Sequence, residues 1–320
     1  MLPDVKLVMP AVSAQSRVAA ATVGQALQGR FRVGRTFDNR SCTSGSVYRV
    51  IELVDHTGHL RANAWPSTFS SLPAFPEWSI VDAAMEIRQK ECGPFGCLAA
   101  IALVPEPAAV DQADALPPNI CPVAGVVDVF RTLVTGIVTP VLQGFVARVL
   151  ADAELMRAYF RVPASRDDHQ AYPGGMAAHA VDMGVNATKI GGLSPLSRDC
   201  VIVLALFHDI GKTMTGAPTP QGNLAHKFIQ HDDLTLELLA KPLRWLGGAW
   251  PDGALALRHA WTAASPGARY GVEPAWAPAV ILQRLDAISR AMAMQREHPC
   301  VNDLVVELSR GRKVWAPREP

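Results

Sequence analysis

The stretch Val201–Gly216, "VIVLALFHDIGKTMTG", determines how the second half of the chain is interpreted. Its first seven residues are all apolar, which is typical of a helix that is buried on every side. His208 and Asp209 follow at once, and Lys212 comes three residues after Asp209. Burying an imidazole or a carboxylate is costly unless the group is hydrogen-bonded, ion-paired or bound to a metal. The stretch therefore predicts a core helix that ends at a polar site.

Apolar residues at helical spacing lie on both sides of this stretch. They predict helices over residues 175–190, 197–207, 232–246, 253–263 and 278–295. Residues 126–162 show the same spacing, with Pro140 marking a break or a helix start. We therefore expect an all-α domain over residues 120–300, followed by a C-terminal tail over residues 301–320.

The first half of the chain has a strand pattern instead. Runs rich in β-branched, aromatic and arginine residues cover residues 26–41, 45–58, 59–67, 79–93 and 97–107. The third and fourth runs are separated by a loop or short helix around residues 67–78. Five strands interrupted after the third predict a small Greek-key barrel of OB type over residues 1–104. Residues 105–119, "PEPAAVDQADALPPN", lack periodicity and are interpreted as the linker between the two domains.

Composition limits the classes of protein to consider. The 320 residues are 49% hydrophobic and 18% charged, with a formal net charge of +1, so no strong overall field attracts nucleic acid or membranes. No apolar run reaches the roughly 20 residues of a transmembrane helix, and no secretory signal is evident. Six cysteines without a CxxC pair indicate reduced thiols and a cytoplasmic location. The oligomeric state stays open, with a homo-oligomer among the options.

His179 and Asp286 extend the polar site of the core helix. Each lies in a segment whose other residues favour a core, as His208 and Asp209 do. Converging from three helices, these side chains would form a mixed nitrogen and oxygen site for a divalent ion. Mn²⁺ is the first choice, and Mg²⁺, Fe²⁺, Ni²⁺ and Zn²⁺ are also compatible. The alternative is a buried network of His–Asp ion pairs without a metal.

The same four residues carry a resemblance to a known family. The pattern of His179, His208–Asp209 and Asp286 resembles the ligand set of the HD metal-dependent phosphohydrolase superfamily, in which "HDIGK" is a frequent motif. "DHQAYPGGMAAHAVDM", residues 168–183, is similar to the segment before that motif in the YhaM-type 3′→5′ exoribonucleases, which place an OB-fold before the HD domain. Residues 257–289 also resemble the segment that leads to that family's last aspartate.

The resemblance implies a larger ligand set and one or two ions. By position, the implied metal ligands are His179, His208, Asp209, His231, His259 and Asp286, with His226 as the rival of His231. The sequence departs from the family pattern where Gln170 replaces a second histidine and where Ala260 follows His259. These departures concern the second metal and the substrate range. A similar histidine-rich stretch occurs in HD-type plasmid relaxases, but Gln170 interrupts the triple-histidine motif that strand transfer needs.

Three residues have candidate catalytic roles. Asp209 is the ligand best suited to bridge two ions, because a carboxylate has two oxygens. Lys212 would neutralise charge that develops on a phosphate, or would be a solvated lysine at a helix end. His169 would contact phosphate or protonate the leaving oxygen, or would orient a metal ligand.

The predicted barrel offers candidate nucleic-acid contacts. OB-folds bind single strands with a cationic groove and aromatic stacking surfaces. The candidate side chains are Arg30, Arg32 and Arg35 on the first strand, with Tyr48 and Trp65 on the next two. The alternative is a solvated basic strand with no ligand.

Together these features favour a metal-dependent phosphodiesterase, in particular a 3′→5′ exonuclease on single-stranded RNA or DNA that uses metal-activated water. A nucleotide phosphohydrolase acting on mononucleotides is the main alternative. A relaxase-related enzyme or a non-catalytic nucleic-acid-binding protein comes next. No membrane partner is expected.

Overall fold

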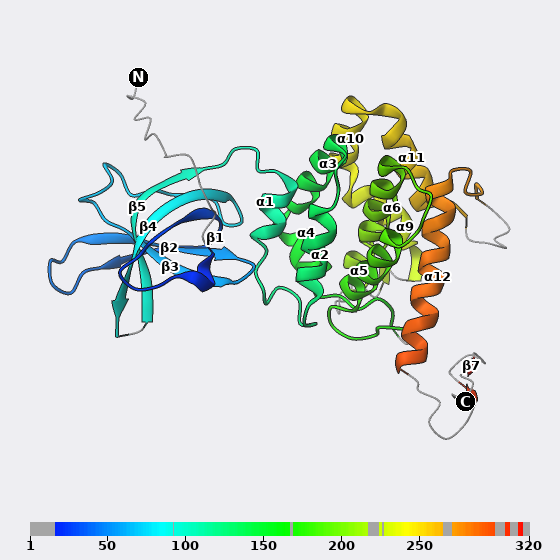
Figure 1. Cartoon of the computed structure of the whole chain (residues 1–320), viewed down its shortest axis with the longest axis horizontal. Helices are drawn as coiled ribbons and strands as arrows, with labels where there is room; N and C mark the ends of the chain where they lie inside the picture. The colour runs from blue at the N-terminus through cyan, green and yellow to red at the C-terminus, as the bar shows by residue number, and fades with distance from the viewer. Residues whose placement is uncertain are drawn as a thin grey trace. The chain divides into compact units, whose positions relative to one another are not determined.

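The computed structural model describes residues 17–91, 93–166, 169–216, 224–225, 227–264, 271–297, 305–307 and 313–315. The chain divides into two compact units, Met1–Asn119 and Ile120–Pro320. The first is a β-barrel, drawn in blue and cyan in Figure 1, and the second is helical. The predicted fold class, a barrel domain followed by a helical domain, is confirmed.

The barrel is closed by five strands in the order β1-β2-β3-β5-β4. Its strands are β1 (Ala26–Arg40), β2 (Val47–Asp55), β3 (Gly58–Ala64), β4 (Ile80–Lys90) and β5 (Gly93–Leu103), after a short 3-10 helix η1 (Val18–Ala20). β3 and β5 pair in parallel, whereas the other neighbours are antiparallel. Alternation along the strands fills the interior with apolar side chains such as Phe31, Ile51, Leu53 and Leu98. This arrangement is compatible with the expected OB type.

The segment that we predicted as a linker is packed onto the barrel instead. It contains helix α1 (Ala109–Asp114), which buries Ala109, Gln112 and Ala113. Arg32 is 1% exposed and donates hydrogen bonds to the carbonyls of Gln112 (2.8 Å) and Ala115 (3.1 Å). The composition of residues 105–119 indicated a linker without regular structure, but this segment contains a helix that contacts a distant strand.

The second unit is built of helices (Figure 1). They are α2 (Val126–Thr135), α3 (Pro140–Leu150), α4 (Ala153–Tyr159), α5 (Gly175–Thr188), α6 (Pro195–Phe207), α7 (Lys212–Thr215), α9 (His231–Leu238), α10 (Ala240–Ala249), α11 (Pro251–Thr262) and α12 (Ala277–Glu297). In the tail, strand β6 (Val305–Glu307) pairs with β7 (Lys313–Trp315). The helix predicted over residues 232–246 is two helices, which meet at Leu239. Within the described residues, no helix has the length and apolar character to cross a membrane.

Helix α6 is the centre of this unit. It packs against α3, α5, α11 and α12, and each residue from Cys200 to Phe207 is buried. Ser194 caps its start by accepting a hydrogen bond from the backbone N–H of Ser197. Near its end, Trp261 Nε1 donates to the carbonyl of Leu204 (3.2 Å), and the Tyr159 hydroxyl donates to that of Leu206 (2.7 Å). The bond from Tyr159 satisfies a carbonyl that the ending helix would leave without a partner.

Candidate metal centre

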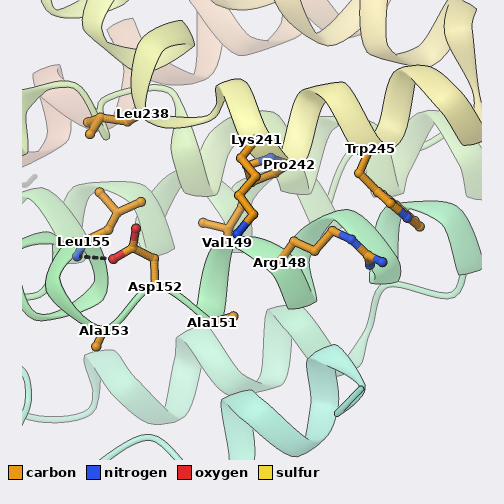
Figure 2. A pocket seen from close by; sticks show the side chains of 10 residues that line it. All are labelled: Arg148, Val149, Ala151, Asp152, Ala153, Leu155, Leu238, Lys241, Pro242 and Trp245. Atoms are coloured by element: carbon orange, nitrogen blue, oxygen red, sulfur yellow. Dashed lines mark hydrogen bonds between the residues drawn. The ribbon is translucent and has the colours of Figure 1, made fainter. Parts of the chain in front are cut away.

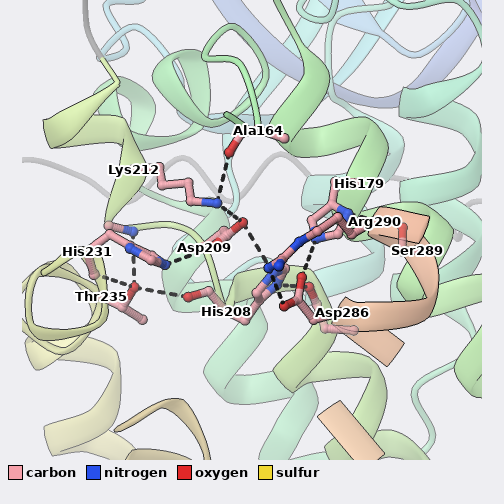
Figure 3. A network of polar contacts seen from close by, with 12 residues as sticks. Ala164, His179, His208, Asp209, Lys212, His231, Thr235, Asp286, Ser289 and Arg290 are labelled. Carbon is pink, nitrogen blue, oxygen red and sulfur yellow. Dashed lines mark hydrogen bonds and ion pairs between the residues drawn. The ribbon is translucent and has the colours of Figure 1, made fainter. Parts of the chain in front are cut away.

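His179 lies in the middle of α5 and is completely buried (Figure 3). Its Nε2 is 3.0 Å from Oδ1 of Asp286, and its Nδ1 is 3.0 Å from Oγ of Ser289. Both partners come from α12, where they are three residues apart and therefore share one helix face. The packing of α12 against α5 thus brings Asp286 to His179.

His208 follows the last residue of α6. Its Nδ1 is 2.9 Å from the carbonyl oxygen of Ala205, and a carbonyl only accepts, so Nδ1 donates. In the neutral imidazole the lone pair is therefore on Nε2. That atom is buried and makes no hydrogen bond to the described part of the chain, although Oδ2 of Asp209 is 3.2 Å away. A buried nitrogen with a free lone pair is what a metal ligand requires.

The side chains of His179, His208 and Asp286 meet at one place. Each offers a ligand atom, and these atoms all lie within 4.8 Å of one another. Two imidazole nitrogens and a carboxylate oxygen suit a divalent transition metal. The unpaired Nε2 of His208 supports the same conclusion, so the residues present fit a metal ion and would hold it at this point.

Asp209 faces another set of partners. Its Oδ2 is 2.6 Å from Nζ of Lys212, and its Oδ1 is 3.1 Å from Nε2 of His231. Lys212 also donates to the carbonyl of Ala164 (2.8 Å), so it is an ion-paired lysine and not a solvated helix end. Asp209 therefore lies beside the three-residue group, in contact with His208, and joins it to Lys212 and His231.

Electrostatics keep both carboxylates charged. Burial alone would raise the pKa of Asp209, but His208 and Lys212 outweigh it and hold this pKa well below the usual range. Burial opposes ionisation of Asp286 too, yet the hydrogen bond from His179 lowers its pKa to about 2. Burial lowers the pKa of His179. Burial would also lower the pKa of His208, but the charge of Asp209 raises it, so a metal ion competes with a proton there.

His169 reaches the site from the segment after α4. It is 4% exposed, and its ring lies edge-on to that of His179 with centroids 5.0 Å apart. The next residue, Gln170, has a positive φ of 48° and donates its backbone N–H to Oε1 of Glu297 (2.8 Å). A Cβ on Gly175 would lie 2.0 Å from the Gln170 carbonyl oxygen, so this close approach requires glycine. The segment is thereby fixed between α5 and α12.

The remaining predicted ligands lie in different places. His231 contacts Asp209, as described above. His259 is on α11, where its Nε2 accepts the backbone N–H of Ala275 (3.0 Å), and it is not part of the three-residue group. His226 lies outside the described residues.

Three residues of the site were not predicted from the sequence: Gly211, Thr235 and Ser289. The hydroxyl of Thr235 accepts the Gly211 N–H (3.1 Å) and lies 3.2 Å from the His208 carbonyl oxygen, which joins α9 to the turn after α6. Ser289 occupies the stripe of buried residues on α12 that includes Leu282, Leu285 and Ala293. A lone hydroxyl in an apolar stripe needs a partner, and this signal was available in the sequence.

The geometry agrees with the comparison with known families. Residues 175–291 match the family model described as HD domain. The helical unit carries an HD domain. Its matched range includes His179, His208, Asp209 and Asp286, and the HD domain implies metal-dependent phosphohydrolase activity. No significant match to a curated protein was found.

Two of the predicted nucleic-acid contacts in the barrel are used internally. Arg32 is buried against Trp78, whose ring centroid is 4.0 Å from its guanidinium carbon, so its assignment to nucleic acid was wrong. α1 covers this face of β1, which the strand pattern alone did not reveal. Arg30 forms ion pairs with Asp82 (2.8 Å) and Asp111 (2.7 Å). Arg35 is exposed.

The predicted aromatic residues do lie together. Tyr48 stacks on Trp65 with ring centroids 4.3 Å apart, and Nζ of Lys90 lies 5.4 Å from the Tyr48 centroid and 4.4 Å from that of Phe95. Tyr48 is only 6% exposed, so it supports Trp65 more than it offers a surface of its own. Trp65, Lys90 and Phe95, with Tyr48 behind them, are called the stacking surface below.

A separate cavity of about 590 Å³ lies between α3, the start of α4, and α10 (Figure 2). The guanidinium carbon of Arg148 lies 3.7 Å from the ring centroid of Trp245, and Asp152 caps α4 by accepting the N–H of Leu155. The charged groups Arg148 and Asp152 are thus engaged in helix packing. We assign no function to this cavity.

Proposed function

We propose that the protein is a metal-dependent phosphodiesterase that removes nucleotides from the 3′ end of single-stranded RNA or DNA. The observation that carries the proposal is the stacking surface, which accompanies an HD domain in one chain. A mononucleotide hydrolase has no need of such a surface, whereas an enzyme for a polymer gains affinity from it.

The stacking surface suits a single strand because it combines rings with a cation. Trp65 and Phe95 are partly exposed, and Lys90 is exposed beside them. Bases stack on aromatic rings whatever their identity, at about 1–3 kcal/mol per base, while a lysine pairs with the phosphates. These residues therefore favour binding that depends little on sequence.

The HD domain provides the means of hydrolysis. His179, His208 and Asp286 would hold a divalent ion, with Mn²⁺ as the first choice, and such an ion lowers the pKa of a coordinated water and polarises a phosphoryl group. Asp209 orients Lys212, whose ammonium would neutralise charge that develops on the phosphate oxygens. If a second ion binds, Asp209 and His231 would be its ligands.

His169 is the proposed proton donor. Its ring edge meets His179, so it borders the metal centre without being one of the three grouped ligands. In hydrolysis of a diester, the bond from phosphorus to the leaving oxygen breaks and that oxygen takes up a proton, which an imidazole can supply.

The test uses the full chain with Mn²⁺ and single-stranded RNA or DNA labelled at either end. With a 5′ label we expect a ladder of shortening products, and with a 3′ label immediate release of a labelled mononucleotide. The opposite pattern would exclude 3′→5′ polarity, and no turnover with any divalent metal would refute the enzyme itself.

A mononucleotide phosphohydrolase remains the second candidate. It is favoured by the internal use of Arg30 and Arg32, which removes two cations from the expected nucleic-acid surface. A panel of nucleoside mono-, di- and triphosphates in the same assay decides between the two. Turnover of these compounds alone, with no shortening of either polymer, would select this second function.

A further inference from the structure

The two histidines of the metal centre differ in what their second ring nitrogen contacts. Nδ1 of His208 contacts the backbone carbonyl of Ala205 (2.9 Å), which only accepts a hydrogen bond. Nδ1 of His179 contacts the hydroxyl of Ser289 (3.0 Å), which can either donate or accept. The contact with Ala205 is therefore compatible with only one tautomer of a neutral His208, whereas the contact with Ser289 is compatible with both tautomers of His179.

Without a metal, the contacts of His179 select one tautomer. Oδ1 of Asp286 belongs to a carboxylate, which only accepts, so Nε2 of His179 carries the hydrogen of this 3.0 Å contact. A neutral ring then has its lone pair on Nδ1. The hydroxyl of Ser289 must donate to that nitrogen.

A metal ion requires the opposite tautomer. The atom of His179 that faces Asp286 and the metal centre is Nε2, so Nε2 must give up its hydrogen and present a lone pair. The proton on Nε2 would leave to solvent and a proton from solvent would be taken up at Nδ1, so the ring stays neutral and no net proton is released. Nδ1 then donates, and Ser289 must turn its hydroxyl to accept, with its own hydrogen free to bond a carbonyl of the preceding helical turn.

We infer that Ser289 is a positioning residue whose hydroxyl reverses between donor and acceptor and thereby lets His179 exchange tautomers when the metal binds. His179 and Ser289 are 0% and 1% exposed, so water has little access to replace the hydroxyl. A carbonyl, a carboxylate or a backbone N–H at the same place would serve only one of the two states. The inference rests on the metal centre of the proposed function.

The first test observes the tautomer directly in the full chain labelled with ¹⁵N-histidine. NMR spectra of the metal-free protein and of the protein with Zn²⁺, a diamagnetic probe, are compared, and His179→Asn identifies the signals of His179. We expect hydrogen on Nε2 without metal and on Nδ1 with Zn²⁺. Hydrogen on Nδ1 in both states would overturn the inference, and this measurement requires no variant of Ser289.

The second test measures Zn²⁺ affinity by calorimetry. Ser289→Ala should weaken binding roughly 10-fold, as is common for residues that orient a metal ligand. Thr188→Ala is the matched control, because it removes an exposed hydroxyl from the helix of His179 and should bind like the wild type. Equal affinity in Ser289→Ala would refute the role of Ser289, whereas absence of binding in the wild type would refute the metal centre itself.

Discussion

Each unit of the protein buries a charged side chain, but the groups that surround the charge differ between the two units. Arg32 of the barrel is surrounded by the carbonyls of Trp78, Gln112 and Ala115, none of which titrates. Asp209 of the HD domain is surrounded by the ionisable side chains of His208, Lys212 and His231. Burial of charge therefore does not by itself identify a functional site. The surroundings of Asp209 differ from those of Arg32 in two respects. They contain ionisable side chains, and they include a nitrogen whose lone pair could bind a metal, Nε2 of His208.

The largest expected effect on activity comes from removing the charge of a proposed metal ligand. Asp286→Asn keeps the shape of the side chain and should lower phosphodiesterase activity roughly 1000-fold, about 4 kcal/mol in the activation barrier. Asp182→Asn is the control, because Asp182 is a partly exposed residue of α5 that pairs with Arg296. Turnover is measured on a small diester and on a labelled strand. Activity within a few-fold of the wild type would show that the three-residue group is not the site.

Removal of the buried charge of the barrel should lower stability and leave hydrolysis unchanged. Arg32→Ala leaves three buried carbonyls without their donor, so we expect about 3 kcal/mol less stability for the barrel. Hydrolysis of a small diester should stay unchanged.

Chemical denaturation monitors this loss, with Arg35→Ala as the exposed control that should change stability by about 0.5 kcal/mol or less. If Arg32→Ala left stability unchanged and weakened only nucleic-acid binding, Arg32 would be a nucleic-acid contact and not a structural residue of the barrel.

Removal of the metal should lower the stability of the HD domain and leave that of the barrel unchanged. At a Mn²⁺ concentration 100-fold above its Kd, binding stabilises the folded HD domain by about 2.7 kcal/mol, and a chelator removes this contribution. Hydrogen exchange followed by mass spectrometry should then show faster exchange in α6 and unchanged exchange in β2. Equal acceleration in both elements would indicate that the metal does not act through the HD domain alone.

The smallest expected effect concerns the stacking surface. Trp65→Ala should weaken binding of a long single strand roughly 10-fold, about 1.4 kcal/mol, while hydrolysis of a small diester is unaffected. Leu103→Ala, which shortens another exposed apolar side chain of the barrel, is the control. Fluorescence anisotropy with a labelled oligonucleotide measures the change. A parallel loss in both substrates would argue against a binding role for Trp65.

The sequence was sufficient for features that local patterns encode. The apolar run of α6 predicted a buried helix, and polar residues in core-forming segments predicted that His179, His208, Asp209 and Asp286 would converge. The structure groups His179, His208 and Asp286, with Asp209 beside them. The five strands were evident from their composition and turns. Each of these depends on periodicity within a short segment.

Features that depend on distant contacts were not predictable in this way. Residues 105–119 have no periodicity, and α1 is ordered by Arg32, which lies more than seventy positions earlier. The side chain of Asp209 faces His231 because of the position of α9. His259 on α11 bonds to the backbone of Ala275, which lies sixteen positions further along the chain. Spacing along the sequence cannot determine which of several nearby histidines a carboxylate will face.

Gly211 has a consequence for the tolerance of this motif to mutation. A Cβ at this position would lie 1.9 Å from the carbonyl oxygen of His231, so even alanine would displace the start of α9. The glycine of "HDIGK" is therefore a steric requirement of a neighbouring helix. Substitution at this position is accordingly limited by whether α9 can remain beside Asp209.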